Sequence, residues 1–229
     1  SGVFGIYKAN TNEDGDIEVV DENNQLLTKF ICLRQQRKMG GTIPNLSIGD
    51  FIAPKATGKQ DYVGCFAVTS GLGIEDRVKA YEANHDDYNS ILLKALADRL
   101  AEAFAEKMHQ LVRTEYWGYV KDESLNNEAL IQEKYQGIRP APGYPACPDH
   151  LEKKSIFTLL DVESKIGLKL TESMAMYPAA AVSGYYFSHP ESKYFGLGKI
   201  NNDQVSSYVE RKGIEVKVAK RWLAPILNE

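Results

Sequence analysis

The chain has 229 residues, 43% of them apolar and 25% charged, with a formal net charge of −4. This composition is typical of a folded globular protein, and the length allows one large domain or two small ones, of which we favour one. Basic residues are dispersed along the chain, which argues against nucleic acid as a partner. No segment approaches the roughly 18 consecutive apolar residues of a membrane span, so no membrane partner is expected.

The first third of the chain alternates β-type segments with polar turns. We expect strands at residues 3–7, 17–20 and 61–69, and a strand or short helix at residues 26–34. The polar residues 10–15 predict the turn of a hairpin, and Gly40-Gly41 marks a loop.

The turn at residues 10–15 has a second interpretation. Asn10, Asn12, Asp14, Gly15 and Asp21 fall at positions of a calcium-binding EF-hand loop. An EF-hand needs a helix on each side, whereas both flanks here are β-like, and Asp21 replaces the usual bidentate Glu. We therefore favour an ordinary hairpin turn.

Apolar residues recur at three- and four-residue steps between residues 75 and 116, with charged residues between them. This spacing predicts one or two long amphipathic helices. Shorter helices are expected at residues 127–135, 151–165, 204–212 and 216–223, and strands at 168–170 and 181–187, separated by Met176-Tyr177-Pro178. No βαβ rhythm repeats, so the predicted fold class is α+β with a mostly antiparallel sheet and long flanking helices.

Several polar residues in the helical region are candidates for a site. His85, Asp86 and His109 could bind a metal or carry a proton, but no second histidine follows at the spacing of one helical turn, so a solvated helix start or cap is favoured. Asp98 and Glu102 lie one helical turn apart and form either ordinary solvated surface or an acidic patch that meets a partner domain. No nucleophile elbow, HExxH or Walker motif is present, and we assign no catalytic residue.

The three cysteines, Cys32, Cys65 and Cys147, are widely separated and show no Cys-x-x-Cys spacing. They predict reduced thiols in a cytoplasmic protein without structural zinc. The chain starts at Ser1 with neither an initiator Met nor a signal peptide, and we interpret this start as a cut.

The segment from Arg139 to Pro148 holds four prolines within nine residues. Prolines fix φ and remove backbone donors, which predicts a stiff loop whose carbonyls face outward as acceptors. Such carbonyls could bind an adenine amino group, Gly143 permits close approach of the backbone, Tyr144 offers an aromatic face, and Arg139 could hold a carboxylate. A rigid connector with an ordinary salt bridge explains the composition equally well.

A second unusual segment, residues 185–195, holds five aromatic side chains around a Pro-Glu-Ser turn. Aromatic residues in a strand more often belong to a core than to a ligand site. Tyr194 and Phe195, beyond the turn, are harder to bury and are candidates for a ligand wall.

Taken together, these segments resemble the C-terminal activation domain of cobalamin-dependent methionine synthase. The similarity rests on Arg139-Pro-Ala-Pro-Gly-Tyr-Pro, Ala181-Val-Ser-Gly-Tyr-Tyr-Phe-Ser and Ser192-Lys-Tyr-Phe. Further matching segments, such as Asp50-Phe-Ile-Ala-Pro-Lys and Tyr116-Trp-Gly-Tyr, extend it over nearly the whole chain. The resemblance implies one curved domain, residues 1–229, that lacks the helical part with which the family's domain begins.

The resemblance also implies a ligand, S-adenosylmethionine. It assigns contacts with this ligand to Arg139, Tyr194 and Phe195, with Pro140, Ala141, Gly143 and Tyr144 completing the adenine end and Glu133 as a weaker candidate. An acidic residue of the missing helical part is expected to bind the ligand's amino group.

The implied function is reactivation of methionine synthase in methionine biosynthesis. Inactive cob(II)alamin is reduced by a flavodoxin-type electron donor, and the domain presents the methyl group of S-adenosylmethionine to the cob(I)alamin formed. Cobalamin is held by another domain, the cobalamin-binding partner, and zinc belongs only to the homocysteine module, which this chain lacks. The isolated chain is not expected to turn over. The alternative is a non-catalytic S-adenosylmethionine-sensing or docking domain.

Overall fold

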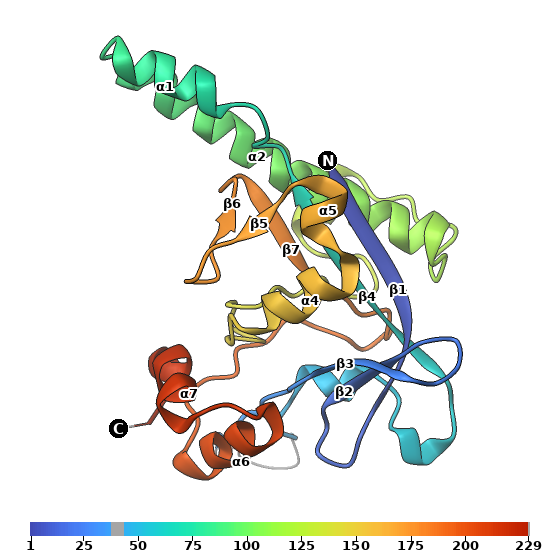
Figure 1. Ribbon diagram of the computed structural model, residues 1–229. Coiled ribbons are helices and arrows are strands. Elements are labelled where there is room, and N and C mark those ends of the chain that lie inside the picture. Colours follow the sequence, from blue (N-terminus) through green and yellow to red (C-terminus); the bar gives the residue numbers. More distant parts are fainter. Residues whose placement is uncertain (38–43, 229) are drawn as a thin grey trace.

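The computed structural model describes residues 1–37 and 44–228, so the loop expected at Gly40-Gly41 lies outside the described residues. Its centre is a five-stranded antiparallel sheet of order β3-β2-β1-β4-β7 (Figure 1). The strands are β1 (Gly2–Thr11), β2 (Ile17–Val20), β3 (Leu26–Phe30), β4 (Asp61–Thr69) and β7 (Ala181–Tyr186). A separate ribbon pairs β5 (Lys169–Leu170) with β6 (Met176–Tyr177). The predicted α+β class is confirmed.

The turn between β1 and β2 is held by one asparagine side chain. Asn12 Oδ1 accepts hydrogen bonds from the backbone N–H groups of Asp14 and Asp16, both at 3.0 Å. Asparagine favours such turns because its side chain can bond its own backbone two residues on. The hairpin interpretation is confirmed, since strands flank the turn where an EF-hand needs helices.

Helices cover both faces of the sheet, and alternation along β4 supplies a core to each. Val63, Cys65 and Ala67 belong to the main core with α4 (Glu152–Leu160), whereas Phe66 and Val68 pack with α2 (Asp87–Leu111) on the opposite face. Side chains of a strand alternate between faces, so one strand serves both layers. All three cysteines are buried free thiols.

Three predicted elements differ from the structure. The helix expected at 151–165 is divided at Asp161, whose φ of 52° is left-handed, and resumes as α5 (Val162–Ile166). The helix expected at 127–135 ends early, as α3 (Asn127–Ile131). Met176-Tyr177, taken as a separator between strands, is itself strand β6, because its residues pair with β5.

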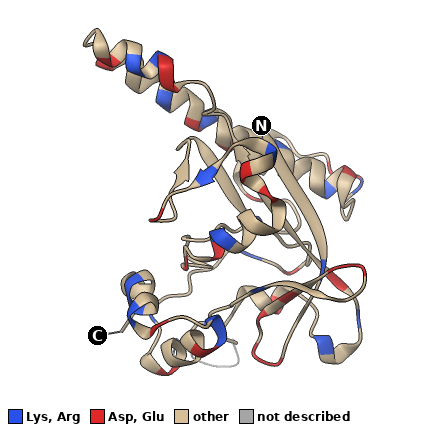
Figure 2. Ribbon diagram, viewed as in Figure 1, with Lys and Arg blue, Asp and Glu red and all other residues tan. Residues whose placement is uncertain are grey.

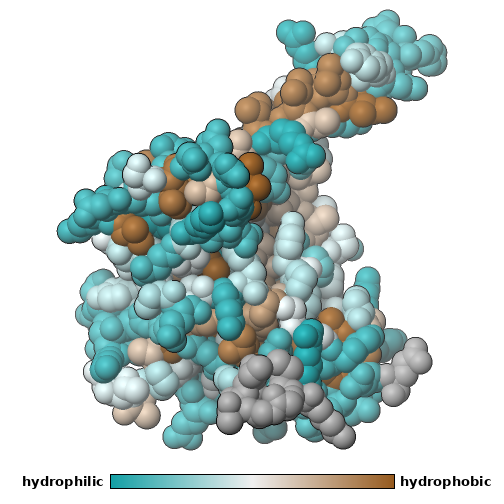
Figure 3. Space-filling model, turned by 180° about the vertical axis from the view of Figure 1, so that it is seen from behind, coloured by the Kyte–Doolittle hydropathy of each residue, from teal (hydrophilic) through white to brown (hydrophobic). Residues whose placement is uncertain are grey.

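Helix α2 and the shorter α1 (Glu75–Ala83) form an arm that projects beyond the sheet (Figure 1). Charges of both signs are spread along this arm (Figure 2). The α2 side chains buried against the body include the small Ala97, Ala101 and Ala105 and, nearer the C-terminal end of the helix, Met108 and His109. Its predicted apolar positions Ile91, Leu96 and Leu100 are instead 52–65% exposed and form an apolar surface on the arm (Figure 3).

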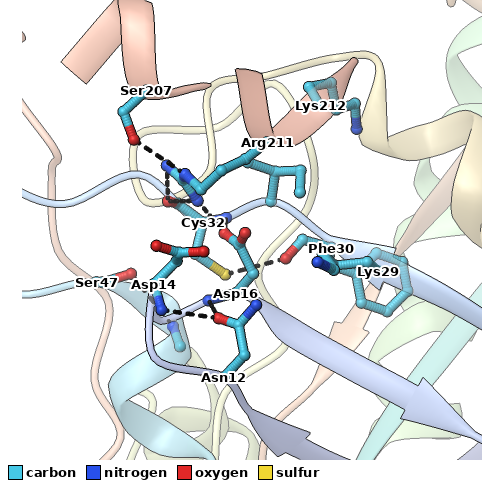
Figure 4. A network of polar contacts seen from close by, with 12 residues as sticks. Asn12, Asp14, Asp16, Lys29, Phe30, Cys32, Ser47, Ser207, Arg211 and Lys212 are labelled. Atoms are coloured by element: carbon cyan, nitrogen blue, oxygen red, sulfur yellow. Dashed lines mark hydrogen bonds and ion pairs between the residues drawn. The ribbon is translucent and has the colours of Figure 1, made fainter. Parts of the chain in front are cut away.

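Two C-terminal helices, α6 (Asn202–Lys212) and α7 (Val216–Leu223), form a third small core with the segment after β3. Arg211 of α6 pairs with Asp16, a fully buried carboxylate that also accepts the backbone N–H of Cys32 at 2.9 Å (Figure 4). Next to this pair, Lys212 contacts the buried Glu152 of α4. These charge pairs fasten α6 to the sheet and to α4.

Candidate functional site: a cavity beside the free edge of β7

The proline-rich loop runs along the outer edge of β7. Ile138 and Phe187 exchange two backbone hydrogen bonds of 3.0 Å, and Tyr185 donates its N–H to the carbonyl of Pro140 at 2.9 Å. Gly184 makes this approach possible, because a Cβ at that position would lie 2.5 Å from the Pro140 carbonyl oxygen. The loop is therefore fixed to the sheet as a sixth, irregular strand.

Several loop carbonyls do not face outward as expected. The carbonyl of Ala141 accepts from the N–H of Tyr144 at 3.1 Å, and that of Pro145 accepts from the N–H of Leu197 at 2.8 Å. The prediction failed because a loop poor in donors finds its partners in neighbouring segments, which leaves fewer backbone acceptors for a ligand.

The second aromatic segment divides between the core and the cavity, except that Phe195, expected to be hard to bury, is partly buried against the core as well as lining the cavity. Tyr185, Tyr186 and Phe187 are at most 1% exposed and belong to the core, whereas Tyr194 is 38% exposed. The hydroxyl of Tyr194 accepts the backbone N–H of Arg139 at 3.0 Å. This bond ties the two segments together at the start of the proline-rich loop.

Between the two segments lies a cavity of about 490 Å³. This volume is within the range of small-molecule sites, roughly 300–1,000 Å³. Its wall consists of Glu102, Glu133, Arg139, Pro140, Ala141, Tyr144, Pro145, Ala146, Val182, Tyr194, Phe195 and Gly196. Seven of the eight residues predicted to contact a ligand are thus in one place.

Three predicted residues have distinctive positions. Gly143 does not line the cavity: its φ is +98°, and a Cβ there would lie 2.2 Å from the ring of His150. Glu102, expected at a partner interface, lines the cavity. Asp98 lies along a separate groove between α1, α2 and the segment Tyr177–Ala180.

Arg139 is held in the cavity wall by a carboxylate that the sequence interpretation did not include. Its Nη2 donates to Glu106 Oε2 at 2.6 Å, and the two side chains are only 21% and 26% exposed. Burial lowers the pKa of Arg139, but Glu106 outweighs this and the net shift is upward, so the guanidinium stays charged. The spacing of Asp98 and Glu102 continues to Glu106, four residues on, and could have indicated it.

Behind Arg139 lies a buried polar layer. Arg113, fully buried, donates to both carboxylate oxygens of Glu123 at 2.7 and 2.6 Å and lies over the ring of Tyr135. His109, also fully buried, stacks on Tyr186 with ring centroids 5.2 Å apart. Burial, and then the charges of Arg113 and Arg139, hold the pKa of His109 well below its usual value, so this ring is neutral.

The metal interpretation of the histidines finds no support in the geometry. Asp86 caps α2 by accepting the N–H of Asn89 at 3.1 Å, as favoured from the sequence, while His109 is buried much further along the same helix. Across residues 1–37 and 44–228, no group of three or more His, Cys, Asp or Glu side chains is placed to hold a metal ion. Within the same residues, no helix is long and apolar enough to cross a membrane.

A cavity with aromatic walls and one oriented guanidinium is typical of a domain that can bind a small organic ligand bearing a carboxylate. Residues 1–213 match the family described as "Vitamin B12 dependent methionine synthase, activation domain", and the chain belongs to this family. It is similar to a crystal structure of the MetH reactivation domain bound to AdoHcy, with 55% sequence identity and a TM-score of 0.95. That match covers 100% of this chain and 70% of the other.

Proposed function

We propose that the chain binds S-adenosylmethionine in the cavity beside β7 and serves the reactivation of methionine synthase. The observation that carries this proposal is the position of Arg139, an oriented guanidinium in the wall of a cavity large enough for a nucleoside-sized ligand. AdoHcy is S-adenosylmethionine without the transferred methyl group, so the similar MetH domain bound to AdoHcy supports the assignment.

The wall offers a partner for each part of the ligand. Arg139 binds the methionine carboxylate, since a guanidinium matches a carboxylate with two parallel N–H groups. Tyr144 and Tyr194, 62% and 38% exposed, offer aromatic faces to the adenine. The carboxylates of Glu102 and Glu133 lie in the same wall and favour the positively charged sulfonium and ammonium groups.

The chain's role in the reaction is to bind and orient. Cobalamin, held by a separate cobalamin-binding domain, supplies the cobalt centre that accepts the methyl group. The described cavity wall contains no cysteine, histidine or lysine that would compete for this methyl group: its polar side chains are two glutamates, one arginine and two tyrosines. Holding the ligand at the carboxylate and adenine ends leaves the sulfonium methyl free to face the partner domain.

The partners follow from this role. We propose that Asp98 and Glu102 face the cobalamin-binding domain, and that a flavodoxin-type donor supplies the electron. The isolated chain then binds its ligand without turning over, and its working compartment is the cytoplasm.

Titration calorimetry with S-adenosylmethionine tests the proposal. Wild-type chain should bind, and Arg139→Ala should weaken binding by about 10- to 100-fold, as expected for a lost charge-assisted hydrogen bond. Arg99, which is exposed on α2, provides the control, and Arg99→Ala should leave the affinity unchanged. An Arg139→Ala chain that binds as tightly as wild type would contradict the assignment.

A further inference from the structure

The ion pair between Glu106 and Arg139 lies at the cavity and differs from an ordinary solvent-exposed ion pair. Both side chains are about three-quarters buried, and the Nη2–Oε2 distance of 2.6 Å is that of a strong charge-assisted hydrogen bond. Arg139 also lines the cavity, so the same guanidinium touches Glu106 on one side and the ligand space on the other.

Glu106 is rigidly placed. It follows Ala105, which is fully buried against the sheet, and precedes Met108 and His109, which are buried in the same contact. The backbone at Glu106 is therefore held against the sheet by its buried neighbours, and its side chain, about three-quarters buried, has little room to turn away. A carboxylate on such a support fixes whatever side chain it binds.

The ion pair is also incomplete. Glu106 Oε1 and Arg139 Nε are both buried and have no hydrogen-bond partner among the described residues. The contact thus uses one N–H of the guanidinium, which carries five, and the remaining N–H groups are not satisfied by Glu106. Glu106 thus holds Arg139 in place while leaving other N–H groups of the guanidinium available for a ligand.

We infer that Glu106 is a positioning residue for ligand recognition: it holds the Arg139 guanidinium at the cavity wall before the ligand arrives, so that the ligand's carboxylate meets an ordered partner. This inference rests on the proposed function. An unrestrained arginine side chain loses much rotamer freedom when it binds, and a side chain that is already ordered loses less. In the complex, Arg139 bridges Glu106 and the ligand carboxylate.

Two ligands that differ at the carboxylate end separate positioning from a merely structural role. S-adenosylhomocysteine carries the amino-acid end, whereas 5′-methylthioadenosine has the same adenosine and a thioether but no carboxylate. By calorimetry, Glu106→Ala should weaken the binding of S-adenosylhomocysteine about tenfold, equivalent to about 1.4 kcal/mol. The same substitution should change the affinity for 5′-methylthioadenosine by no more than about twofold, because that ligand has no carboxylate to bind Arg139.

Further variants complete the test. Glu106→Gln keeps an oxygen that accepts from Nη2 and should recover part of the lost affinity; it also serves if Glu106→Ala does not fold. In an Arg139→Ala background, Glu106→Ala should have no additional effect. The matched control is Glu115→Gln, an exposed carboxylate just beyond α2, which should leave both affinities unchanged.

Two outcomes would overturn the inference. One is an equal loss for both ligands, which indicates that Glu106 only supports the fold. The other is tighter binding of S-adenosylhomocysteine by Glu106→Ala, which indicates that Glu106 competes with the ligand for Arg139. Failure of the wild-type chain to bind either ligand would instead refute the proposed function, and this inference with it.

Discussion

Replacement of Arg211 by alanine is expected to lower the free energy of unfolding by about 3 kcal/mol, because it leaves a buried carboxylate without its cation. Asp16 is 0% exposed, and besides pairing with Arg211 its carboxylate accepts the N–H of Cys32 (Figure 4). Breaking a buried ion pair costs roughly 3–5 kcal/mol. We take the lower end because the Arg211 side chain is 13% exposed, so water can reach the space that it leaves.

Urea unfolding followed by circular dichroism measures this loss directly. For a chain of this length, about 3 kcal/mol corresponds to a decrease of roughly 6–12 °C in Tm, at about 2–4 °C for each kcal/mol. Asp16→Asn provides the complementary variant. In the Arg211→Ala background it should restore part of the stability, because a buried amide without a partner costs less than a buried charge.

The pH dependence of the same variant gives an independent check. Burial raises the pKa of Asp16 above its usual value even with Arg211 present, and removal of Arg211 should raise it further. A raised folded-state pKa means that the folded chain takes up a proton more readily than the unfolded chain, so stability is regained as pH falls. Arg211→Ala should therefore lose less stability at about pH 5 than at about pH 8. A loss below about 1 kcal/mol at both values would refute the buried-charge argument.

Three more predictions concern the layers around the site. Because the pKa of His109 is lowered in the folded chain, its contribution to stability is present above about pH 6.5 and lost as the pH falls below that value. His109→Phe keeps the ring stack, and the free energy of unfolding in urea should then depend less on pH in that range. Gly184→Ala should push the loop off β7, which lowers stability by about 1–3 kcal/mol in urea and weakens S-adenosylmethionine binding in calorimetry. Glu123→Gln leaves the fully buried Arg113 without its anion and should cost about 3 kcal/mol, visible as a lower Tm.

Most of the sheet could be predicted from the sequence because its signals are local. The apolar run of β4 and the Asn12 turn predict a strand and a hairpin without reference to the rest of the chain, although β4, expected to be half-buried, is buried on both faces because helices cover both sides of the sheet. The division of the helix at Asp161 was not predictable in this way. Aspartate tolerates the left-handed region better than most residues, but the helical spacing of residues 151–165 continues through Asp161 and does not mark it as the break.

Helix α2 shows a different limit of sequence periodicity. Its exposed side carries Ile91, Leu96 and Leu100, whereas the side that meets the sheet consists of alanines one helical turn apart together with Met108 and the partly buried Phe104. Small residues allow a helix to approach a neighbour closely, and their low hydrophobicity makes that contact hard to recognise in an amphipathic pattern. The hydrophobic pattern thus predicted the helix correctly, and it predicted the buried side correctly at Phe104 and Met108 but not along the projecting arm.

The candidate site was found through its unusual loops, and its missing member lay on an ordinary helix. Arg139 and Tyr194 belong to segments whose proline or aromatic content is unusual enough to make them candidates, whereas Glu106 is one of many acids on a charged helix. What distinguishes Glu106 is the long-range contact that brings α2 against the Arg139 loop across 33 positions of sequence. One carboxylate in a regular helical series becomes a candidate for the site only when its partner in the fold is known. Here the partner is Arg139, whose position is set by the pairing of its loop with β7. The same backbone pairing that makes the loop rigid therefore also gives Glu106 its role.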